Sequence, residues 1–269
     1  MLPTVEFCGL NPTRLIIGAN PFGGFSHQSS ERNKEMLAFH TPDRIVETWR
    51  RAEAAGINTM ITNSESPNVV EAVKRYLGEG GKLQWIAQVN NLKTASMFQA
   101  IDECAAIGCK ALYFHGAKTD NLYALRDENT LREWVDYARH KAGVPVVGVA
   151  GHSPEVHLWV NSLDVVDFHA VCFFKCGSLH YGQGHKFYLR DVMPAVECIK
   201  AIRKPCIGYK IMGAGRIEPR MAFEYAFENI KPIDAVNVGM HRGDKDNIVE
   251  ENAAIVRELM AEPALAGAR

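Results

Sequence analysis

The regular alternation of short apolar runs with amphipathic stretches constrains the fold of this 269-residue chain more than any other feature. The apolar runs are rich in β-branched residues and are bounded by glycine, proline or polar residues. Such runs are typical of strands buried on both faces, as in parallel sheets. We expect eight strands, at residues 15–20, 57–62, 83–89, 109–114, 144–150, 165–174, 205–211 and 234–239.

Helical segments separate these strands. Thr41, Pro42 and Asp43 form a helix start signal, with threonine as the cap, proline in the first turn and an acidic residue near the positive end of the helix dipole. Gly56 ends the segment. The same reasoning predicts helices at 41–56, 67–77, 94–107, 131–142, 153–163, 189–202, 218–227 and 247–259. Residues 28–40 are polar and carry no helical pattern, so we expect a loop there.

Eight strands that alternate with eight helices predict an α/β fold, a single-domain (β/α)8 TIM barrel. We expect the barrel to span residues 1–260 and the small, proline-containing segment 261–269 to be a frayed tail. A doubly wound open sheet is the alternative that the same alternation allows.

Composition limits the partners. A formal net charge of −1 gives no reason to expect nucleic acid or an anionic membrane. The seven cysteines are odd in number and lie mostly inside apolar runs, which predicts reduced thiols and a cytoplasmic setting. No run reaches the 18 apolar residues of a membrane span. We therefore expect a small-molecule substrate. The composition leaves open whether the protein forms a homo-oligomer.

In a barrel of this type the active site lies at the carboxyl ends of the strands. Neutral amides that suit hydroxyl groups, and so a carbohydrate-like substrate, fall at these ends: Asn20, Asn63, Gln88 and Asn90. Two arginines, Arg216 and Arg242, follow the seventh and eighth strands. With His241 they predict a cationic site for a phosphate or carboxylate group of the substrate.

Three successive strands each bring one histidine to the same end of the barrel: His115, His152 and His169. Converging imidazoles, with Glu65, Asp120 or a water completing the shell, suit a divalent metal such as zinc, manganese or iron. A histidine on a strand is also common as a hydrogen-bonded core residue. In the alternative to the metal site, His115 acts as a general acid or base alone and the other two are only hydrogen-bonded nearby.

Lys210 ends the seventh strand. A desolvated lysine there can serve as a base or a Schiff-base nucleophile, whereas a lysine that reaches past the strand end into solvent has no such role. The glycine-rich segment 177–184 is a candidate lid.

Several stretches resemble the aldo-keto reductase family. LIIGANPFGG (15–24) is similar to the family's first strand, and Ile57-Asn-Thr-Met is similar to its second. ALYFHGAK (111–118) resembles the strand that carries the family's catalytic histidine. VGVAGHSP (147–154), VVDFHAVCFF (165–174) and VNVGMHRGDKDNIVEEN (236–252) resemble the later strands and the last helix. The resemblance covers nearly the whole chain and implies the barrel and an NADP-linked reductase.

The catalytic positions that the resemblance implies depart from the family pattern. The family's aspartate falls at Asn58, its tyrosine at Asn63 and its lysine at Gln88 or Val89, and only His115 is retained. The nicotinamide contacts would be Ala150, Gly151 and Ala170, and only Phe173 could stack. An amide cannot donate the proton that a tyrosine gives to a carbonyl. We therefore do not expect NADP.

The function that the sequence predicts is an enzyme acting on a small polar, carbohydrate-like substrate. We expect metal-assisted or histidine-based acid–base chemistry of the lyase, isomerase or epimerase type, carried by His115, His152 and Lys210. The alternatives are an NADP-linked aldo-keto reductase-like oxidoreductase and a non-catalytic barrel that binds a metabolite.

Overall fold

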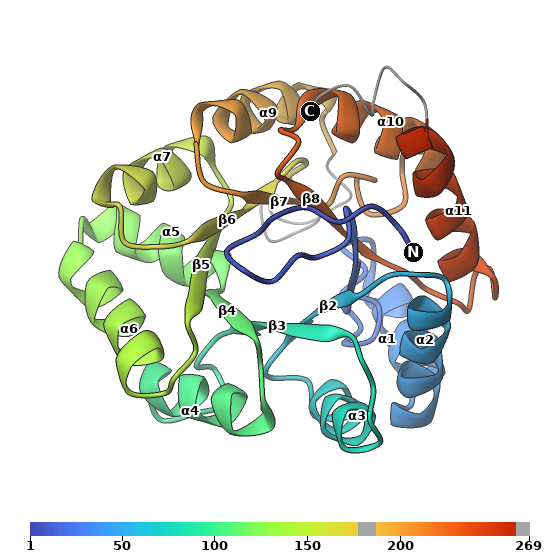
Figure 1. The fold of residues 1–269 in the computed structure, drawn as a ribbon, viewed down its shortest axis with the longest axis horizontal. Coiled ribbons are helices and arrows are strands. Elements are labelled where there is room, and N and C mark those ends of the chain that lie inside the picture. Colours follow the sequence, from blue (N-terminus) through green and yellow to red (C-terminus); the bar gives the residue numbers. More distant parts are fainter. Residues whose placement is uncertain (177–186, 262–269) are drawn as a thin grey trace.

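A computed structural model describes residues 1–176 and 187–261. Eight parallel strands close into a barrel in the order β1 to β8, with β8 paired to β1 (Figure 1). The strands are β1 (Leu15–Gly18), β2 (Thr59–Asn63), β3 (Gln84–Val89), β4 (Ala111–Phe114), β5 (Val146–Gly151), β6 (Phe168–Cys172), β7 (Cys206–Tyr209) and β8 (Ala235–Gly239). The predicted (β/α)8 barrel is confirmed, and the open sheet is excluded by the pairing that joins Leu15 to Val236.

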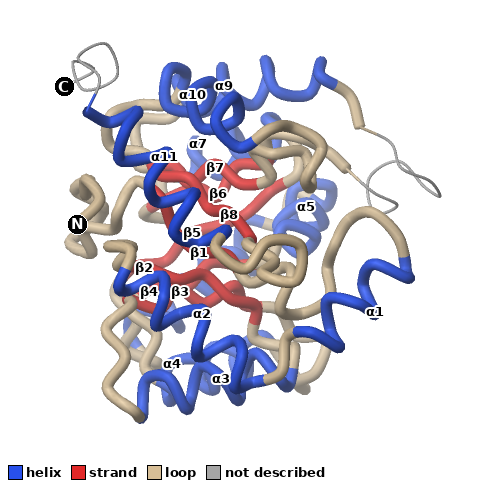
Figure 2. Tube along the Cα trace, turned by 90° about the vertical axis from the view of Figure 1, so that its right-hand side faces the viewer, coloured by secondary structure: helices blue, strands red, loops and turns tan. Residues whose placement is uncertain are grey.

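Helices surround the barrel (Figures 1 and 2). They are α1 (Ser30–Phe39), α2 (Pro42–Ala54), α3 (Pro67–Gly78), α4 (Met97–Ile107), α5 (Gly116–Leu125), α6 (Glu128–His140), α7 (Pro154–Leu163), α9 (Val192–Ala201), α10 (Pro219–Asn229) and α11 (Ile248–Ala261), with a 3₁₀ turn, η1, at Leu189–Asp191. None of these helices, in the part of the chain that the structure describes, has the length and apolar character needed to cross a membrane.

Two of these helices were not predicted. α1 lies in the segment expected to be a loop, and α5 follows β4 directly. α1 is polar and buries only Met36, so it lacks the apolar stripe on which the prediction depends. α5 is capped by His115 rather than by one of the usual serine, threonine or aspartate caps. Both helices lie next to the carboxyl ends of strands, where they shape the site.

Strand residues alternate between the barrel interior and the layer under the helices. The interior cluster includes Ile86, Tyr113 and Phe168, and Phe7 of the N-terminal segment closes one end, with its ring centroid 5.1 Å from that of Phe168. The interior is crowded: a Cβ at Gly148 would come within 2.6 Å of the Phe168 ring. The opposite end, at the carboxyl ends of the strands, is the mouth.

Candidate functional site

A histidine at the end of β5 is held by a carboxylate. Nδ1 of His152 lies 2.6 Å from Oδ2 of Asp120, and the His152 backbone N–H donates to Oδ1 of the same carboxylate at 3.1 Å. Burial acts to raise the pKa of Asp120, but the hydrogen bond and the charge of His152 lower it below its ordinary value. An ionised carboxylate only accepts hydrogen bonds, so Nδ1 carries the proton. The lone pair is then on Nε2, as a general base requires.

The close approach of the His152 ring to α5 depends on a glycine. A Cβ at Gly116, the first residue of α5, would lie 2.7 Å from Cε1 and 3.0 Å from Nδ1 of His152. Contacts this short do not occur between a Cβ and a ring, so any side chain at this position would displace the imidazole. The absence of a side chain at Gly116 therefore helps to set the position of His152.

His115 carries its proton on the other ring nitrogen. Its Nδ1 accepts the backbone N–H of Ala117 at 3.1 Å, so that the neutral ring has its hydrogen on Nε2. Burial, and then the neighbouring His152, lower the pKa of His115 to about 4. His115 is therefore neutral at physiological pH and is a hydrogen-bond donor through Nε2. The ring centroids of His115 and His152 are 6.3 Å apart.

Lys210 and Tyr209 lie at the end of β7, on the same part of the mouth. The Lys210 charge is one of the influences that lower the pKa of His115, and the Lys210 backbone is left-handed, with φ of 58°. The Tyr209 hydroxyl donates to the Gly151 carbonyl at 3.2 Å. Burial raises the pKa of Tyr209 well above its ordinary value, which makes this phenol a poor proton donor.

Two of the predicted substrate-binding amides hold the rim of the mouth. The Asn63 side-chain oxygen accepts two backbone N–H groups at the start of α3, at 3.0 and 2.8 Å. The Asn90 amide donates to Oε2 of Glu65 at 3.2 Å, and Oε1 of Glu65 accepts the Leu92 backbone N–H at 3.0 Å. Both Glu65 oxygens are thus used within the rim, and the structure does not place Glu65 in a site with the predicted histidines.

The other two amides also lie at the mouth. The Gln88 side-chain oxygen accepts the Tyr113 hydroxyl at 3.0 Å. The Asn20 amide nitrogen lies 3.3 Å from Nε2 of His27. Substrate contact by any of the four amides stays a prediction.

The predicted three-histidine metal site is not formed. Both residues that flank His169 in β6 line the barrel interior, so His169 points to the opposite face, toward α7. Its Nδ1 lies 3.2 Å from Nδ1 of His157. His115 and His152 remain together at the mouth, but each uses Nδ1 for a bond within the protein. Strand alternation therefore separates His169 from the other two.

The predicted cationic site is not formed either. Arg242 is 7% exposed and binds Glu47 at 2.8 Å and Asp246 at 2.6 Å. Nδ1 of His241 lies 2.9 Å from Nε2 of His40. Arg216 donates to the carbonyls of Gly213 and His27 and so joins two loops. The carboxylates that neutralise Arg242 come from α2 and from the loop before α11, which the sequence pattern did not bring together.

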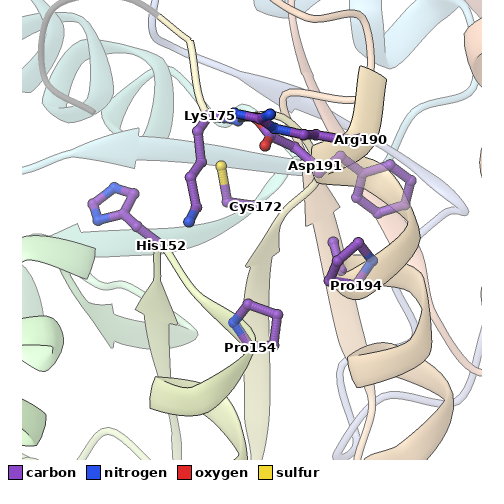
Figure 3. A pocket seen from close by; sticks show the side chains of 9 residues that line it. His152, Pro154, Cys172, Lys175, Arg190, Asp191 and Pro194 are labelled. Atoms are coloured by element: carbon purple, nitrogen blue, oxygen red, sulfur yellow. Dashed lines mark hydrogen bonds between the residues drawn. The ribbon is translucent and has the colours of Figure 1, made fainter. Parts of the chain in front are cut away.

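A cavity of about 240 Å³ adjoins His152. It lies between the ends of β5 and β6 and the start of α9 (Figure 3). Its polar lining consists of His152, Cys172, Lys175, Arg190 and Asp191. The sequence analysis did not identify Arg190 and Asp191, which follow the segment 177–186, and the lid predicted at 177–184 lies outside the described residues. It named Asp120 only as a possible metal ligand and did not predict its hydrogen bond to His152, because α5 was not predicted.

The geometry does not support the catalytic positions implied by the reductase resemblance. Asn58 precedes β2 and bonds to the carbonyl of Asn11 and to Thr13, so it lies at the opposite end of the barrel from the mouth. Its assignment to the family's aspartate position was wrong. Phe173 is 1% exposed and is packed so close to Gly208 that a Cβ there would come within 2.7 Å of its ring. Phe173 is therefore packed inside the barrel wall and is not placed to stack on a nicotinamide as the resemblance implies.

Comparison with known proteins identifies the fold. No family model and no curated protein sequence matches the chain. Among solved structures, a protein from Pseudomonas aeruginosa provisionally assigned as an aldo-keto reductase matches 96% of this chain and 94% of its own, with a TM-score of 0.68 and 16% identity. An aldo-keto reductase from Bacillus halodurans, in its holo form, matches 96% of each chain with a TM-score of 0.59 and 8% identity. These likenesses confirm that the barrel fold of this chain is similar to that of aldo-keto reductases.

Other enzymes share the barrel fold at a similarly low sequence identity. An orotidine 5'-monophosphate decarboxylase from Methanocaldococcus jannaschii matches 94% of this chain and 100% of its own, with a TM-score of 0.55 and 13% identity. A protein described as an aldolase matches 82% of this chain and 92% of its own, with a TM-score of 0.51 and 14% identity. Likenesses this remote show the fold alone, so the chemistry must be argued from the site.

Proposed function

We propose that this protein is an enzyme that transfers a proton to and from carbon in a small hydroxy-carbonyl substrate. The observation that carries the proposal is the complementary protonation of the two mouth histidines. Asp120 leaves Nε2 of His152 as an acceptor, and the Ala117 backbone N–H leaves Nε2 of His115 as a donor. A base and a hydrogen-bond donor side by side are the two groups that enolisation requires.

The proposed reaction begins with the carbonyl oxygen of the substrate accepting a hydrogen bond from Nε2–H of His115. Nε2 of His152 removes the proton from the adjacent carbon, and the electron pair of that C–H bond moves to form an enediolate. His115 and the positive charge of Lys210 stabilise the negative oxygen. Return of the proton to a neighbouring carbon gives an isomerase, return to the opposite face gives an epimerase, and loss of a neighbouring group gives a lyase.

The cavity lining suggests the substrate class. Lys175 and Arg190 are cations on its wall, Asp191 is an acid there that accepts the Lys175 backbone N–H, and His152 lies at its border. Hydroxyl groups suit the amides of the rim, and a carboxylate or phosphate suits the two cations. We infer a small acidic carbohydrate or hydroxy acid.

Exchange with solvent deuterium tests the proposal without knowledge of the product. The protein is incubated in D₂O with a panel of small aldoses, ketoses and their acid or phosphate derivatives, and the C–H signals next to the carbonyl are followed by proton NMR. We expect exchange with at least one member, and its loss in His152→Ala. The matched control is His140→Ala, an exposed histidine on α6. Exchange that persists unchanged in His152→Ala, or that is absent with every member, would count against the proposal.

Titration with NADPH separates this proposal from the reductase alternative. We expect no saturable change in NADPH fluorescence, because Phe173 is buried and the implied contact positions Ala150, Gly151 and Ala170 have no polar side chain. Tight binding of NADPH together with oxidation of the cofactor by a carbonyl substrate would favour the reductase instead.

A further inference from the structure

A second group of side chains lies away from the His115–His152 site, between α1 and the end of β8. Glu35 projects from α1, and His241 and Asp244 follow β8. One carboxylate oxygen from each acid and one histidine nitrogen all lie within 4.8 Å of one another. Within residues 1–176 and 187–261 this is the one group of three such residues with donor atoms so close.

His241 is what distinguishes this group from an ordinary acidic surface patch. Its side chain is 4% exposed, and its Nε2 has no hydrogen-bond partner among the described residues. That nitrogen lies 4.0 Å from Oε1 of Glu35. A buried polar atom without a partner is unfavourable by about 1–3 kcal/mol, so its persistence needs an explanation.

The other ring nitrogen of His241 is held as a metal-binding histidine requires. Nδ1 lies 2.9 Å from Nε2 of His40, which is fully buried. If a neutral His241 donates from Nδ1 to His40, its Nε2 has a lone pair, and an oxygen of each carboxylate lies within 4.8 Å of the ring's donor atom. A second hydrogen bond of this kind fixes the tautomer of metal-bound histidines.

Two neighbours keep the site assembled and open. Arg32 bonds to Oε2 of Glu35 at 2.7 Å and to Oδ2 of Asp244, which holds both acids near His241 and leaves Oε1 of Glu35 toward the imidazole. A Cβ at Gly243 would lie 2.6 Å from Nε2 of His241, so the space at that nitrogen exists because position 243 has no side chain.

We propose that Glu35, His241 and Asp244 bind a divalent transition-metal ion, zinc being the ion we would test, which fastens α1 to the β8 end of the mouth. One imidazole with two carboxylates favours zinc over magnesium or calcium, which prefer oxygen ligands. Zinc bonds of about 2.0–2.2 Å place tetrahedral ligand atoms about 3.4 Å apart. Oε1 of Glu35 lies 4.0 Å from Nε2 of His241, and the remaining donor-atom pairs lie within 4.8 Å, so the two exposed acids must close in by up to roughly 1.4 Å to reach that spacing. Figure 2 shows α1 set apart from the other helices. A metal ion bound by Glu35, His241 and Asp244 would link this helix to the segment after β8.

Calorimetric titration of the whole protein with zinc chloride, after treatment with a chelator, tests this site. We expect one site, with affinity reduced at least about tenfold in Glu35→Gln and in Asp244→Asn, and no binding of magnesium at the same concentration. His241→Ala should abolish the site, and Gly243→Ala should block it while all three ligands stay in place. Zinc should also raise the Tm of the wild type and not of these variants.

The controls separate this site from others that could take up zinc. Gly78→Ala changes a glycine whose Cβ would meet no atom within 4 Å, and His140→Ala removes an exposed histidine on α6. Both should bind zinc like the wild type. Zinc binding that is equal in wild type, Glu35→Gln and Gly243→Ala would overturn the proposal, and so would no binding in the wild type. Failure of the deuterium exchange would leave this result unaffected, since neither readout depends on activity.

Discussion

Two pairs of histidines lie on opposite faces of the same part of the barrel wall. His115 and His152 are at the mouth, where each bonds through Nδ1 to another group of the protein. His157 and His169 lie between the wall and α7, bond to each other at 3.2 Å and are fully buried. The comparison teaches that a histidine just past the end of a strand reaches the mouth, whereas His169, inside β6, points to the helix layer because both of its neighbours line the interior.

The buried pair His157 and His169, here the outer pair, supports the mouth pair, His115 and His152, through one backbone carbonyl. Nε2 of His157 lies 3.3 Å from the Gly151 carbonyl, which also accepts the Tyr209 hydroxyl. Gly151 immediately precedes His152. If His157 donates from Nε2, its Nδ1 must accept from Nδ1–H of His169, and Nε2 of His169, which has no partner among the described residues, is an unprotonated lone pair. This arrangement fixes the backbone that carries His152.

The largest expected effect is on the mouth pair. His152→Ala should lower the proton-exchange rate by at least about a hundredfold, since general base catalysis contributes roughly 10² to 10⁴. His152→Ala should lower the free energy of unfolding, measured in urea, far less than His169→Ala does. His169 is fully buried, so its replacement by alanine leaves a cavity. If His169→Ala lowers the rate as much as His152→Ala in a folded protein, the distinction between the two pairs is lost.

A smaller effect is expected at the glycine next to His152. Gly116→Ala should lower the exchange rate by about tenfold or more. The new Cβ would lie 2.7 Å from Cε1 of His152 and would displace the imidazole. Circular dichroism should show the barrel intact. Gly78→Ala is the matched control on α3, with no atom within 4 Å of the new Cβ, and should retain the wild-type rate. Equal rates in both variants would show that the position of the ring does not depend on Gly116.

The outer pair should make the free energy of unfolding depend on pH in the acid range. Burial lowers the pKa of His157 from 6.5 to about 4 and that of His169 well below 6.5. Below pH 6.5 the unfolded chain therefore binds protons that the folded chain does not. Their contribution to stability is complete above that pH and is lost as the pH falls toward 4, by up to about 1.4 kcal/mol per pH unit for each histidine.

Urea unfolding at pH 7, 6 and 5 measures this slope. His157→Gln should reduce the slope by about the share of one histidine, whereas His140→Gln, on the exposed surface of α6, should leave it unchanged. The buried His40 and His115, whose pKa values are also lowered, contribute equally to wild type and to both variants. An unchanged slope in His157→Gln would contradict the assignment of His157 as a neutral buried residue.

The smallest effect is expected at Arg242, far from both pairs. Its ion pairs with Glu47 and Asp246 are partly exposed on the carboxylate side, so Arg242→Ala should lower the free energy of unfolding by on the order of 1 kcal/mol or less. KM for a substrate found in the exchange screen should stay within about twofold of the wild type. A large rise in KM would instead support the cationic substrate site that the sequence suggested.

The sequence by itself determined a parallel sheet covered by helices and favoured a barrel, and the pairing of β8 with β1 excluded the open sheet. Eight short β-branched runs, such as 144–150, cannot bury both faces except in a parallel sheet covered by helices, and the strand ends follow from the turns after each run. It also placed His115 and His152 correctly at neighbouring strand ends. The sequence could not show which face His169 takes, because the run around it is apolar on both faces and period-two alternation has no polar face to mark.

Only the tertiary structure decided which polar groups meet. Asp120 lies on α5 and bonds to His152, but the apolar pattern of α5 is too weak for this helix to be predicted. Glu47 lies on α2 and pairs with Arg242, which is far from it in the sequence. The same holds for the meeting of Glu35 with His241. Apolar periodicity records what faces the core, whereas the partner of a charged or imidazole side chain depends on distances between elements far apart in the chain, which no local pattern contains.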